Sequence, residues 1–369
     1  LYEINVPQAG GLEIIKGPGS ALYGSDAMHG VINVLSGKIP DEQLIKLGAE
    51  YGTTEWYRHL VTYGDRINEE HAFRLDLNQT FMEGWRDNSD YSRHSATAQW
   101  LWTPSADFEM KTIATYNYVD QSSVSGLSKY DWKHNPDENY YRLPGRDVES
   151  FRISSKMTKY LDDNSEFSIT PYFRHSYTSG LIPSSRLSTN PAPFANNSEI
   201  WDNGFQSYGA LMNYTQHFDK WDSMLVVGLD YDYSPGEYEV EQIALTRDFR
   251  PDGRVFFTDY GRTGSMIYDF ESTYTSYSPY IHFETSPHEK LRLDFGLRYD
   301  YAEFEIDQKL NDPGAIQDDK VSFEQLSPKF GFIFDYASNH QLYGSYRRGF
   351  RAPSVGSLFA APASEDSLE

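Results

Sequence analysis

The sequence contains no cysteine among its 369 residues. This absence excludes thiolate metal sites, structural disulfides and a cysteine nucleophile, and it is typical of cell-envelope proteins that fold in an oxidising compartment. Basic residues are also scarce, because 32 Lys and Arg stand against 54 Asp and Glu for a formal charge of -22. A phosphate-binding surface needs clustered Lys and Arg, so we expect no nucleic-acid partner.

Long apolar runs are missing as well. No stretch approaches the ~20 consecutive apolar residues that a membrane-spanning helix needs. A membrane β-barrel is still compatible with the sequence, because its strands alternate lipid-facing and lumen-facing residues and are not apolar on average. Aromatic residues make up 16% of the chain, with 29 Tyr and 22 Phe. The chain begins at Leu1 without a charged and then apolar signal segment, so we expect a mature or truncated product.

From about residue 43 onward the dominant hydrophobic period is two. In the segment 291–301 the odd positions are Leu, Phe and Tyr, whereas the even positions are Arg, Asp and Gly. This alternation predicts a strand with one apolar face and one polar or charged face. The same pattern occurs over 73–78 and 225–233. We expect roughly a dozen strands of about 9 to 15 residues, longer than the ~5 to 6 that are usual in soluble sheets.

The predicted connections alternate between short and long. Short links are expected within 64–70, 103–108, 161–166, 218–223, 285–290 and 336–340. Long links are expected within 82–91, 119–147, 178–205, 234–272 and 304–322. An up-and-down barrel in an outer membrane has this pattern, with short periplasmic turns and long outer loops. A soluble propeller or jelly roll is the alternative, and the strand length and the lack of a 20-to-50-residue repeat argue against it.

Aromatic residues near the predicted strand ends are candidates for interfacial girdles. They include Trp85, Trp100, Trp102, Trp221 and Tyr336.

The first 40 residues do not follow this pattern. Two short apolar runs, at 12–16 and 31–35, are joined by a glycine-rich stretch. We expect a small α/β element with strands at these positions and a helical turn over 20–28, with Ser20 as its N-cap. A nucleotide-binding loop is excluded because neither G-x-x-x-x-G-K-[ST] nor G-x-G-x-x-G occurs there.

The stretch 12–38, LEIIKGPGSALYGSDAMHGVINVLSGK, resembles the end of the plug domain of TonB-dependent outer-membrane receptors. The matching positions are Glu13, Lys16, Gly17, Pro18, Ser20, Leu22, Tyr23, Gly24, Ala27, Gly30, Val31, Ile32 and Asn33. Lys16 stands where the family more often has Arg, and His29 stands where a glycine is usual. The segments 295–300, 326–332 and 342–359 are similar to barrel strands of the same family.

This resemblance implies a mostly β fold, a transmembrane antiparallel up-and-down β-barrel with an N-terminal α/β plug. The barrels of such transporters have about 22 strands. Residues 1–41 would be the C-terminal part of the plug, and residues 42–369 would be a partial barrel of roughly 12 to 13 strands. We therefore expect a fragment of a longer receptor.

The resemblance also implies contacts between the plug and the barrel wall. The plug residues concerned are Glu13, Lys16, Gly17, Pro18, Tyr23, Gly24, Gly30 and Asn33. Alternation directs charged wall residues into the lumen, namely Arg74, Asp76, Arg292, Asp294, Arg298 and Asp300.

The implied function is active import across the Gram-negative outer membrane. The main expected cargo is a ferric siderophore. The partners would be the TonB–ExbB–ExbD energy-transducing complex, an iron-chelate ligand and outer-membrane lipid, with no cofactor, no resident metal and no catalysis. Haem, cobalamin or an oligosaccharide are alternative cargoes. Haem is suggested by His29 and by Phe350, Arg351, Ala352 and Pro353, which match a "FRAP" box. A passive porin or an adhesin is the alternative of a different class.

Ligand capture is expected in the long outer loops, where aromatic rings and guanidinium groups occur together. Such groups suit planar or anionic iron chelates through stacking, cation–π contacts and charge-assisted hydrogen bonds. The candidate residues are Tyr130, Trp132, Tyr140, Tyr141, Arg142, Arg247, Arg250, Arg254, Tyr260 and Arg262. No nucleophile elbow and no pair of His at metal-binding spacing occurs, so the sequence does not predict an enzyme.

Overall fold

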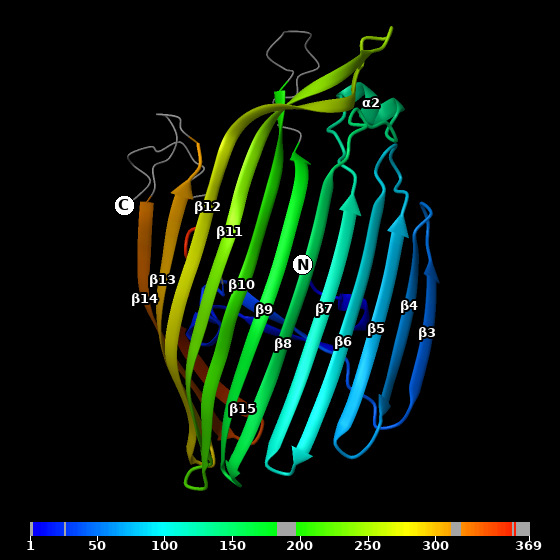
Figure 1. Cartoon of the computed structure of the whole chain (residues 1–369). Helices are drawn as coiled ribbons and strands as arrows, with labels where there is room; N and C mark the ends of the chain where they lie inside the picture. The colour runs from blue at the N-terminus through cyan, green and yellow to red at the C-terminus, as the bar shows by residue number, and fades with distance from the viewer. Residues whose placement is uncertain (1–2, 26, 183–196, 311–318, 356–357, 359–369) are drawn as a thin grey trace.

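Thirteen antiparallel strands form one large curved sheet in the computed structural model, which describes residues 3–25, 27–182, 197–310, 319–355 and 358 (Figure 1). Each strand pairs with its neighbours in the sequence, so the sheet is an up-and-down meander as predicted. The strands are β3 (Leu44–Tyr51), β4 (Tyr57–Arg66), β5 (His71–Met82), β6 (Tyr91–Ser105), β7 (Phe108–Gln121), β8 (Arg146–Asp162), β9 (Ser165–Ile182), β10 (Asn197–Phe218), β11 (Ser223–Phe249), β12 (Val255–His288), β13 (Leu291–Gln308), β14 (Asp319–Ala337) and β15 (His340–Arg347).

The short links are confirmed at one end of the sheet. There, β6 and β7 are joined by residues 106–107, β8 and β9 by 163–164, and β12 and β13 by 289–290. At the opposite end, residues 122–145 join β7 to β8 and contain helix α2 (Lys129–His134). Of the predicted long link 178–205, residues 183–196 lie outside the described residues.

The prediction of a long loop over residues 234–272 is wrong. Strand β11 continues to Phe249 and β12 begins at Val255, so only residues 250–254 connect them. The segment is rich in Glu, Asp and Gly and therefore resembled a loop, but apolar residues spaced along it, among them Val240, Ile243 and Phe257, are buried. Register shifts interrupt the β11–β12 ladder at 240/241, 242/243 and 246/247. Such bulges bend strands, and in Figure 1 both strands curve over toward α2.

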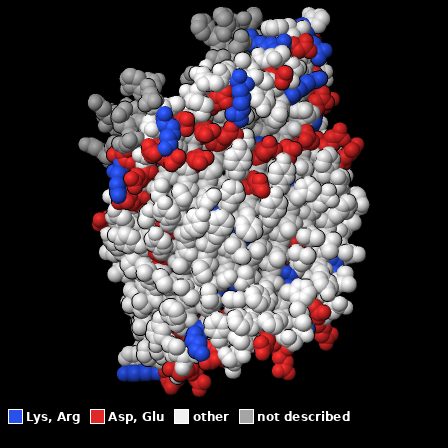
Figure 2. Space-filling view, in the orientation of Figure 1, with Lys and Arg blue, Asp and Glu red and all other residues white. Residues whose placement is uncertain are grey.

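The two faces of the sheet differ in the way the alternation predicted. On β13, Phe295 and Leu297 expose 40% and 42% of their surface, whereas Arg298 and Asp300 expose 6% each. Figure 2 shows Lys, Arg, Asp and Glu gathered mainly toward the two ends of the outer surface, with a broad belt between that is largely uncharged. This inside-out distribution is the one that a lipid-facing sheet requires.

Aromatic side chains lie near the short-link end of the sheet. His71, Trp100 and Trp102 stack on one another with ring centroids 5.8 to 6.3 Å apart. Trp221 lies in the short link between β10 and β11, where the Lys220 ammonium sits 4.4 Å from its ring centroid. No helix in the described ranges is long and apolar enough to cross a membrane.

The N-terminal residues form a separate hairpin against the sheet (Figure 1). A 3₁₀ turn, η1 (Val6–Gln8), precedes β1 (Gly11–Lys16), and helix α1 (Ser20–Tyr23) leads to β2 (Gly30–Leu35), which pairs antiparallel with β1. The expected N-cap role of Ser20 is wrong, because Gly19 is the N-cap and Ser20 is the first helical residue. The Ser20 hydroxyl instead accepts a hydrogen bond from the Phe350 backbone N–H at 3.3 Å.

Polar side chains on the inner face of the sheet bind the backbone of this N-terminal segment. Arg93 donates to the Ile4 carbonyl at 2.5 Å, and Gln99 donates to the Gly37 carbonyl at 3.0 Å. Arg74 donates to the Lys38 carbonyl at 2.8 Å while its guanidinium also pairs with Asp76 at 2.8 Å. The charges of the wall thus satisfy both one another and carbonyl groups that water would otherwise solvate.

Gly30 offers a test of the β1–β2 hairpin. A Cβ at this position would lie 2.7 Å from the Ile15 carbonyl oxygen, so Gly30→Ala must displace one strand from the other. We expect the substitution to destabilise the hairpin locally by about 1 to 3 kcal/mol. Amide hydrogen exchange of residues 11–35 measures the effect.

Gly11→Ala is the matched control for Gly30→Ala. It lies on the same hairpin, and its Cβ would make only an ordinary contact, 3.7 Å from the Leu35 Cδ1 atom. Equal exchange rates in the two variants would contradict the close packing at Gly30.

Candidate functional site

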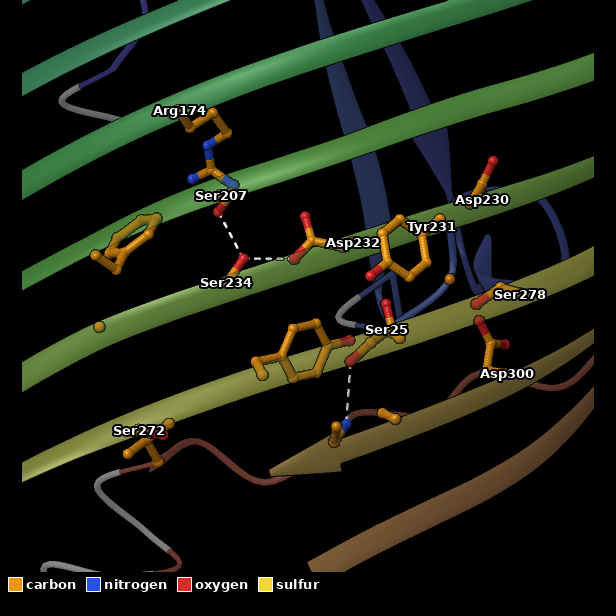
Figure 3. Close-up of a pocket in the computed structure, with 18 of the residues that line it drawn as sticks. Ser25, Arg174, Ser207, Asp230, Tyr231, Asp232, Ser234, Ser272, Ser278 and Asp300 are labelled. Atoms are coloured by element: carbon orange, nitrogen blue, oxygen red, sulfur yellow. Dashed lines mark hydrogen bonds between the residues drawn. The ribbon is translucent and has the colours of Figure 1, made fainter. Parts of the chain in front are cut away.

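A cavity of about 560 Å³ lies between the N-terminal hairpin and the inner face of β9 to β13 (Figure 3). One side of it is formed by Tyr23, the last residue of α1, and by Gly24 and Ser25, which come directly after it. The segment after β15 contributes Phe350, Ala352 and Val355. The cavity therefore lies where the glycine-rich motif meets the wall.

Charged and hydroxyl side chains from the strands dominate the wall of this cavity. Three carboxylates, Asp230, Asp232 and Asp300, accompany two guanidinium groups. Both guanidinium groups are already paired. Arg298 binds Asp230 at 2.6 Å and Asp300 at 2.7 Å, and Arg174 binds Glu3 at 3.0 Å. Among the described residues, the side chains that line the cavity thus carry a net negative charge. Neither guanidinium group in the lining is left unpaired to bind an anionic ligand.

Hydroxyl groups extend the polar lining beside these carboxylates. Tyr172 donates a hydrogen bond to Asp232, and Ser234 bonds both Asp232 and, at 2.6 Å, Ser207 (Figure 3). Three further serines, Ser272, Ser276 and Ser278, come from β12. Such a surface suits a ligand that donates hydrogen bonds through hydroxyl or ammonium groups.

Gly24 brings the hairpin into direct contact with this ion-pair network. Its φ of +72° is a left-handed conformation that glycine adopts at no steric cost. A Cβ at Gly24 would also lie 3.1 Å from the Arg298 Nη2 atom. Ser25 fixes the neighbouring segment by accepting a hydrogen bond from the Ala352 N–H at 3.0 Å. Two of the predicted motif residues, Tyr23 and Gly24, thus line the cavity.

The other predicted hairpin residues lie outside the cavity. Asn33 donates to Glu13 at 2.9 Å across the β1–β2 pair, and Lys16 lies opposite Gly30 in the same register. The Gly17 N–H donates to the His29 carbonyl at 3.1 Å. Pro18 lies beside Gly349.

Neither a wall contact of Glu13 or Lys16 nor a ligand contact of His29 is seen among the described residues. No ion pair there joins Glu13 or Lys16 to the sheet, so their contact with the wall stays a prediction. The side chain of His29 is exposed and is not part of the cavity lining.

The ten predicted outer-loop residues lie in or beside an outer cap, formed by residues 122–145 and 245–262. Phe256 is at its centre. The guanidinium carbons of Arg142, Arg250 and Arg254 lie 5.0, 5.2 and 5.8 Å from the Phe256 ring centroid. The Tyr140 ring meets the same ring edge-on at 5.8 Å. In the part of the chain that the structure describes, none of the ten residues lines the cavity.

The guanidinium groups of the cap mostly have carboxylate partners. Arg254 pairs with Glu138 at 2.8 Å, and Arg262 pairs with Asp202 at 2.7 Å and with Glu241 at 2.8 Å. Arg142 lies 3.6 Å from Glu138, and Arg250 lies 3.0 Å from Asp248. In these pairs the guanidinium groups bind carboxylates of the protein, whereas the sequence interpretation had assigned them to ligand binding.

Aromatic residues of the cap divide into a buried and an exposed set. Tyr141 and Tyr260 pack against a buried cluster that includes Leu143 and Phe257. Tyr130 and Trp132, on α2, expose 66% and 67% of their surface. For Arg247, the Nε and Nη2 atoms are buried without a hydrogen bond to any described residue.

The buried carboxylate of Asp131 holds α2 against the cap. Tyr140 donates to it, as do the Asn135 amide at 2.8 Å and the Ser128 hydroxyl at 2.9 Å. These hydrogen bonds, that of Tyr140 foremost, hold the pKa of Asp131 below its ordinary value.

The wall residues of the cavity were the part of the site that sequence reasoning missed. Asp230 and Arg298 are 68 positions apart in the chain, and only the pairing of β11, β12 and β13 brings them together. The available signal was the alternation, which correctly directed Arg298 and Asp300 to the inner face. It did not indicate which strands share a cavity.

Comparison with known proteins places this architecture in a family. The family model described as "TonB dependent receptor-like, beta-barrel" matches residues 36–367. The chain belongs to the TonB-dependent receptor family. Members of this family are receptors and transporters of the outer membrane, so the enzyme classes weighed above find no support in it.

Solved structures of receptors and transporters share the fold of this TonB-dependent receptor chain. The siderophore receptor PiuA from Acinetobacter baumannii superposes with a TM-score of 0.75 at 16% identity, over 97% of this chain and 56% of that chain. The copper transporter OprC superposes with a TM-score of 0.72 at 15% identity, over 100% of this chain and 55% of that chain. At these identities the likeness shows the fold alone.

Among curated proteins, the metal-pseudopaline receptor CntO of Pseudomonas aeruginosa strain UCBPP-PA14 is 22% identical over 186 residues. That match covers 46% of this chain and 25% of the relative. The chain thus spans about a quarter of this curated relative and little more than half of the solved structures.

The pKa shift of Asp131 predicts how the cap responds to acid. Because its folded pKa is lowered, its stabilising effect is complete above the ordinary Asp pKa of about 3.9 and is lost as the pH falls through the lower folded value. Hydrogen-exchange protection factors of residues 122–145 should therefore fall as the pH drops below about 4.

Asp131→Asn should lower the same protection factors about tenfold at neutral pH, through the loss of charge-assisted hydrogen bonds, and should flatten their pH dependence. Asp137→Asn is the control, because Asp137 is an exposed carboxylate in the same segment. A parallel fall of protection with acid in wild type and Asp131→Asn would contradict the assignment.

Proposed function

We propose that this chain is part of an outer-membrane receptor that actively imports a metal chelate, foremost a ferric siderophore, with energy supplied through TonB, ExbB and ExbD. The observation that carries the proposal is the cavity between the glycine-rich motif and the inner wall. A ligand held there touches both the hairpin and the barrel. Ligand binding and hairpin position are then coupled.

The chemistry of the lining narrows the class of cargo. The three carboxylates and the many hydroxyl groups, with both guanidinium groups already paired, disfavour a polyanionic chelate such as a ferric tris-catecholate. They favour a neutral or cationic complex whose periphery carries hydroxyl or ammonium donors. This differs from the anionic chelates that the Arg-rich outer loops suggested.

A role for the outer cap in cargo entry is part of the same proposal. The exposed Tyr130 and Trp132 offer aromatic surface at the outer end of the molecule, and stacking on them would be a first contact for a chelate. The cap guanidinium groups would fix the shape of the entrance through their ion pairs.

Transport would then use two states of the hairpin with different affinities for the cargo. In the state described here, the Ser20–Phe350 and Ser25–Ala352 hydrogen bonds and the contact of Gly24 with Arg298 hold the hairpin to the wall. Each of these contacts is modest, and a buried ion pair contributes little net stability. Force from TonB could separate them without unfolding the sheet.

Uptake by a strain that lacks its own receptors tests the proposal. With the full receptor supplied, we expect TonB-dependent uptake of at least one ferric or other metal chelate from a panel that spans anionic, neutral and cationic complexes. Asp232→Asn and Asp300→Asn should reduce uptake of a neutral or cationic chelate about tenfold, because each removes an acceptor charge from the lining.

Asp163→Asn is the matched control, since this carboxylate is exposed in the short link between β8 and β9, outside the cavity and at the end of the sheet opposite the cap. Failure of surface-expressed receptor to take up any chelate in the panel would sink the import proposal. Uptake that is insensitive to both cavity variants would show that the cargo binds elsewhere.

A further inference from the structure

A second polar cluster lies on the inner face of β12 and β13, beyond the cavity toward the short-link end of the sheet. It consists of His282, Glu284 and Asp294, whose nitrogen and carboxylate ligand atoms all lie within 4.8 Å of one another. Glu284 and Asp294 are opposite each other in the strand register, and His282 is opposite Gly296. We propose that these three side chains bind a divalent transition-metal ion.

The hydrogen bonding of His282 is the observation that points to a cation. One ring nitrogen, Nε2, lies 2.9 Å from a Glu284 carboxylate oxygen, so in a neutral ring it carries the proton. The other nitrogen, Nδ1, then presents a lone pair. This nitrogen is buried and has no hydrogen bond to any described residue, and His282 as a whole is only 5% exposed.

The lone pair of His282 faces another acceptor. An oxygen of Asp294, Oδ1, lies 3.5 Å from Nδ1 and is itself buried without a hydrogen-bond partner among the described residues. Two facing acceptors repel unless a proton or a metal ion lies between them, and the second possibility is the one proposed. A separation of 3.5 Å is also close to the ~3.4 Å between neighbouring ligands of a tetrahedral ion with bonds of ~2.1 Å.

The ligand types indicate which ions would bind. An imidazole with two carboxylates suits Zn²⁺, Ni²⁺ or Co²⁺ better than Mg²⁺ or Ca²⁺, which prefer oxygen alone. The Glu284 side chain is 52% exposed, and to join the ion at Nδ1 its carboxylate would move away from the His282 Nε2 atom.

The neighbouring Lys329 sets the strength of the site. Its ammonium lies 2.6 Å from the second oxygen of Asp294 and leaves the first oxygen free for the metal. As a fixed positive charge beside the ligands, it opposes a second cation. The site is therefore expected to be moderate in affinity, and its affinity should rise when Lys329 is neutralised.

Metal titration of the full receptor, purified in detergent and stripped with a chelator, tests this site without any siderophore present. Zn²⁺ and Ni²⁺ binding is measured by calorimetry, and Co²⁺ binding by its visible absorption. We expect one ion per receptor to be lost or weakened about tenfold or more in His282→Ala and in Asp294→Asn. Glu284→Gln, at a half-exposed position, repeats the test without disturbing a buried group, and Lys329→Gln should bind severalfold more tightly.

His288→Ala is the matched control, because His288 is exposed at the end of the same strand. Circular dichroism confirms that each variant keeps its β-sheet. The proposal is overturned if the stripped receptor binds no ion, or if the His282→Ala and wild-type titrations coincide while both are folded. Because no chelate is present and none of the three residues lines the cavity, this outcome is independent of the cargo experiment.

Discussion

The pairing of charges on the inner face of the sheet is the constraint on which the rest of the structure depends. A sheet that turns its apolar side chains outward must place its polar side chains inward, and each buried charge there needs a partner. Arg74 with Asp76, and Arg298 with Asp230 and Asp300, meet this need within the wall. Arg74 also donates to the Lys38 carbonyl, and Arg298 lies against Gly24, so groups that make the lumen polar also contact the N-terminal segment.

Much of the fold could be predicted because the alternation of residue types is a local signal. The strands around Arg298 and the short link at 163–164 follow from period-two patterns and from turn residues. The hairpin followed from a longer motif, although the role given to Ser20 was wrong since the capping position fell one residue earlier. The 234–272 error has the opposite origin, because the Glu, Asp and Gly residues there suggested a loop, whereas the burial of Ile243 and Phe257 depends on distant segments.

The candidate site could be predicted only in part, because it is assembled across strands. Tyr23 and Gly24 belong to a contiguous motif and were found. Asp230 and Asp232 carry no distinguishing mark in the sequence, since many similar acidic residues alternate along other strands. The cap residues were found by type, but nothing local revealed that Arg254 and Arg262 have carboxylate partners from distant segments.

Strands β11 and β12 connect the lumen to the cap by one continuous ladder of backbone hydrogen bonds, bent at three register shifts. Phe256, at the outer end of this ladder, is therefore held by paired strands and not by a flexible loop. Widening the entrance at this point would break hydrogen bonds between paired backbone amides. An unpaired loop could move with only a change in its conformational entropy. The width of the entrance is in this sense a property of the sheet, and it is set by the same register that positions Asp230 and Asp232 below it.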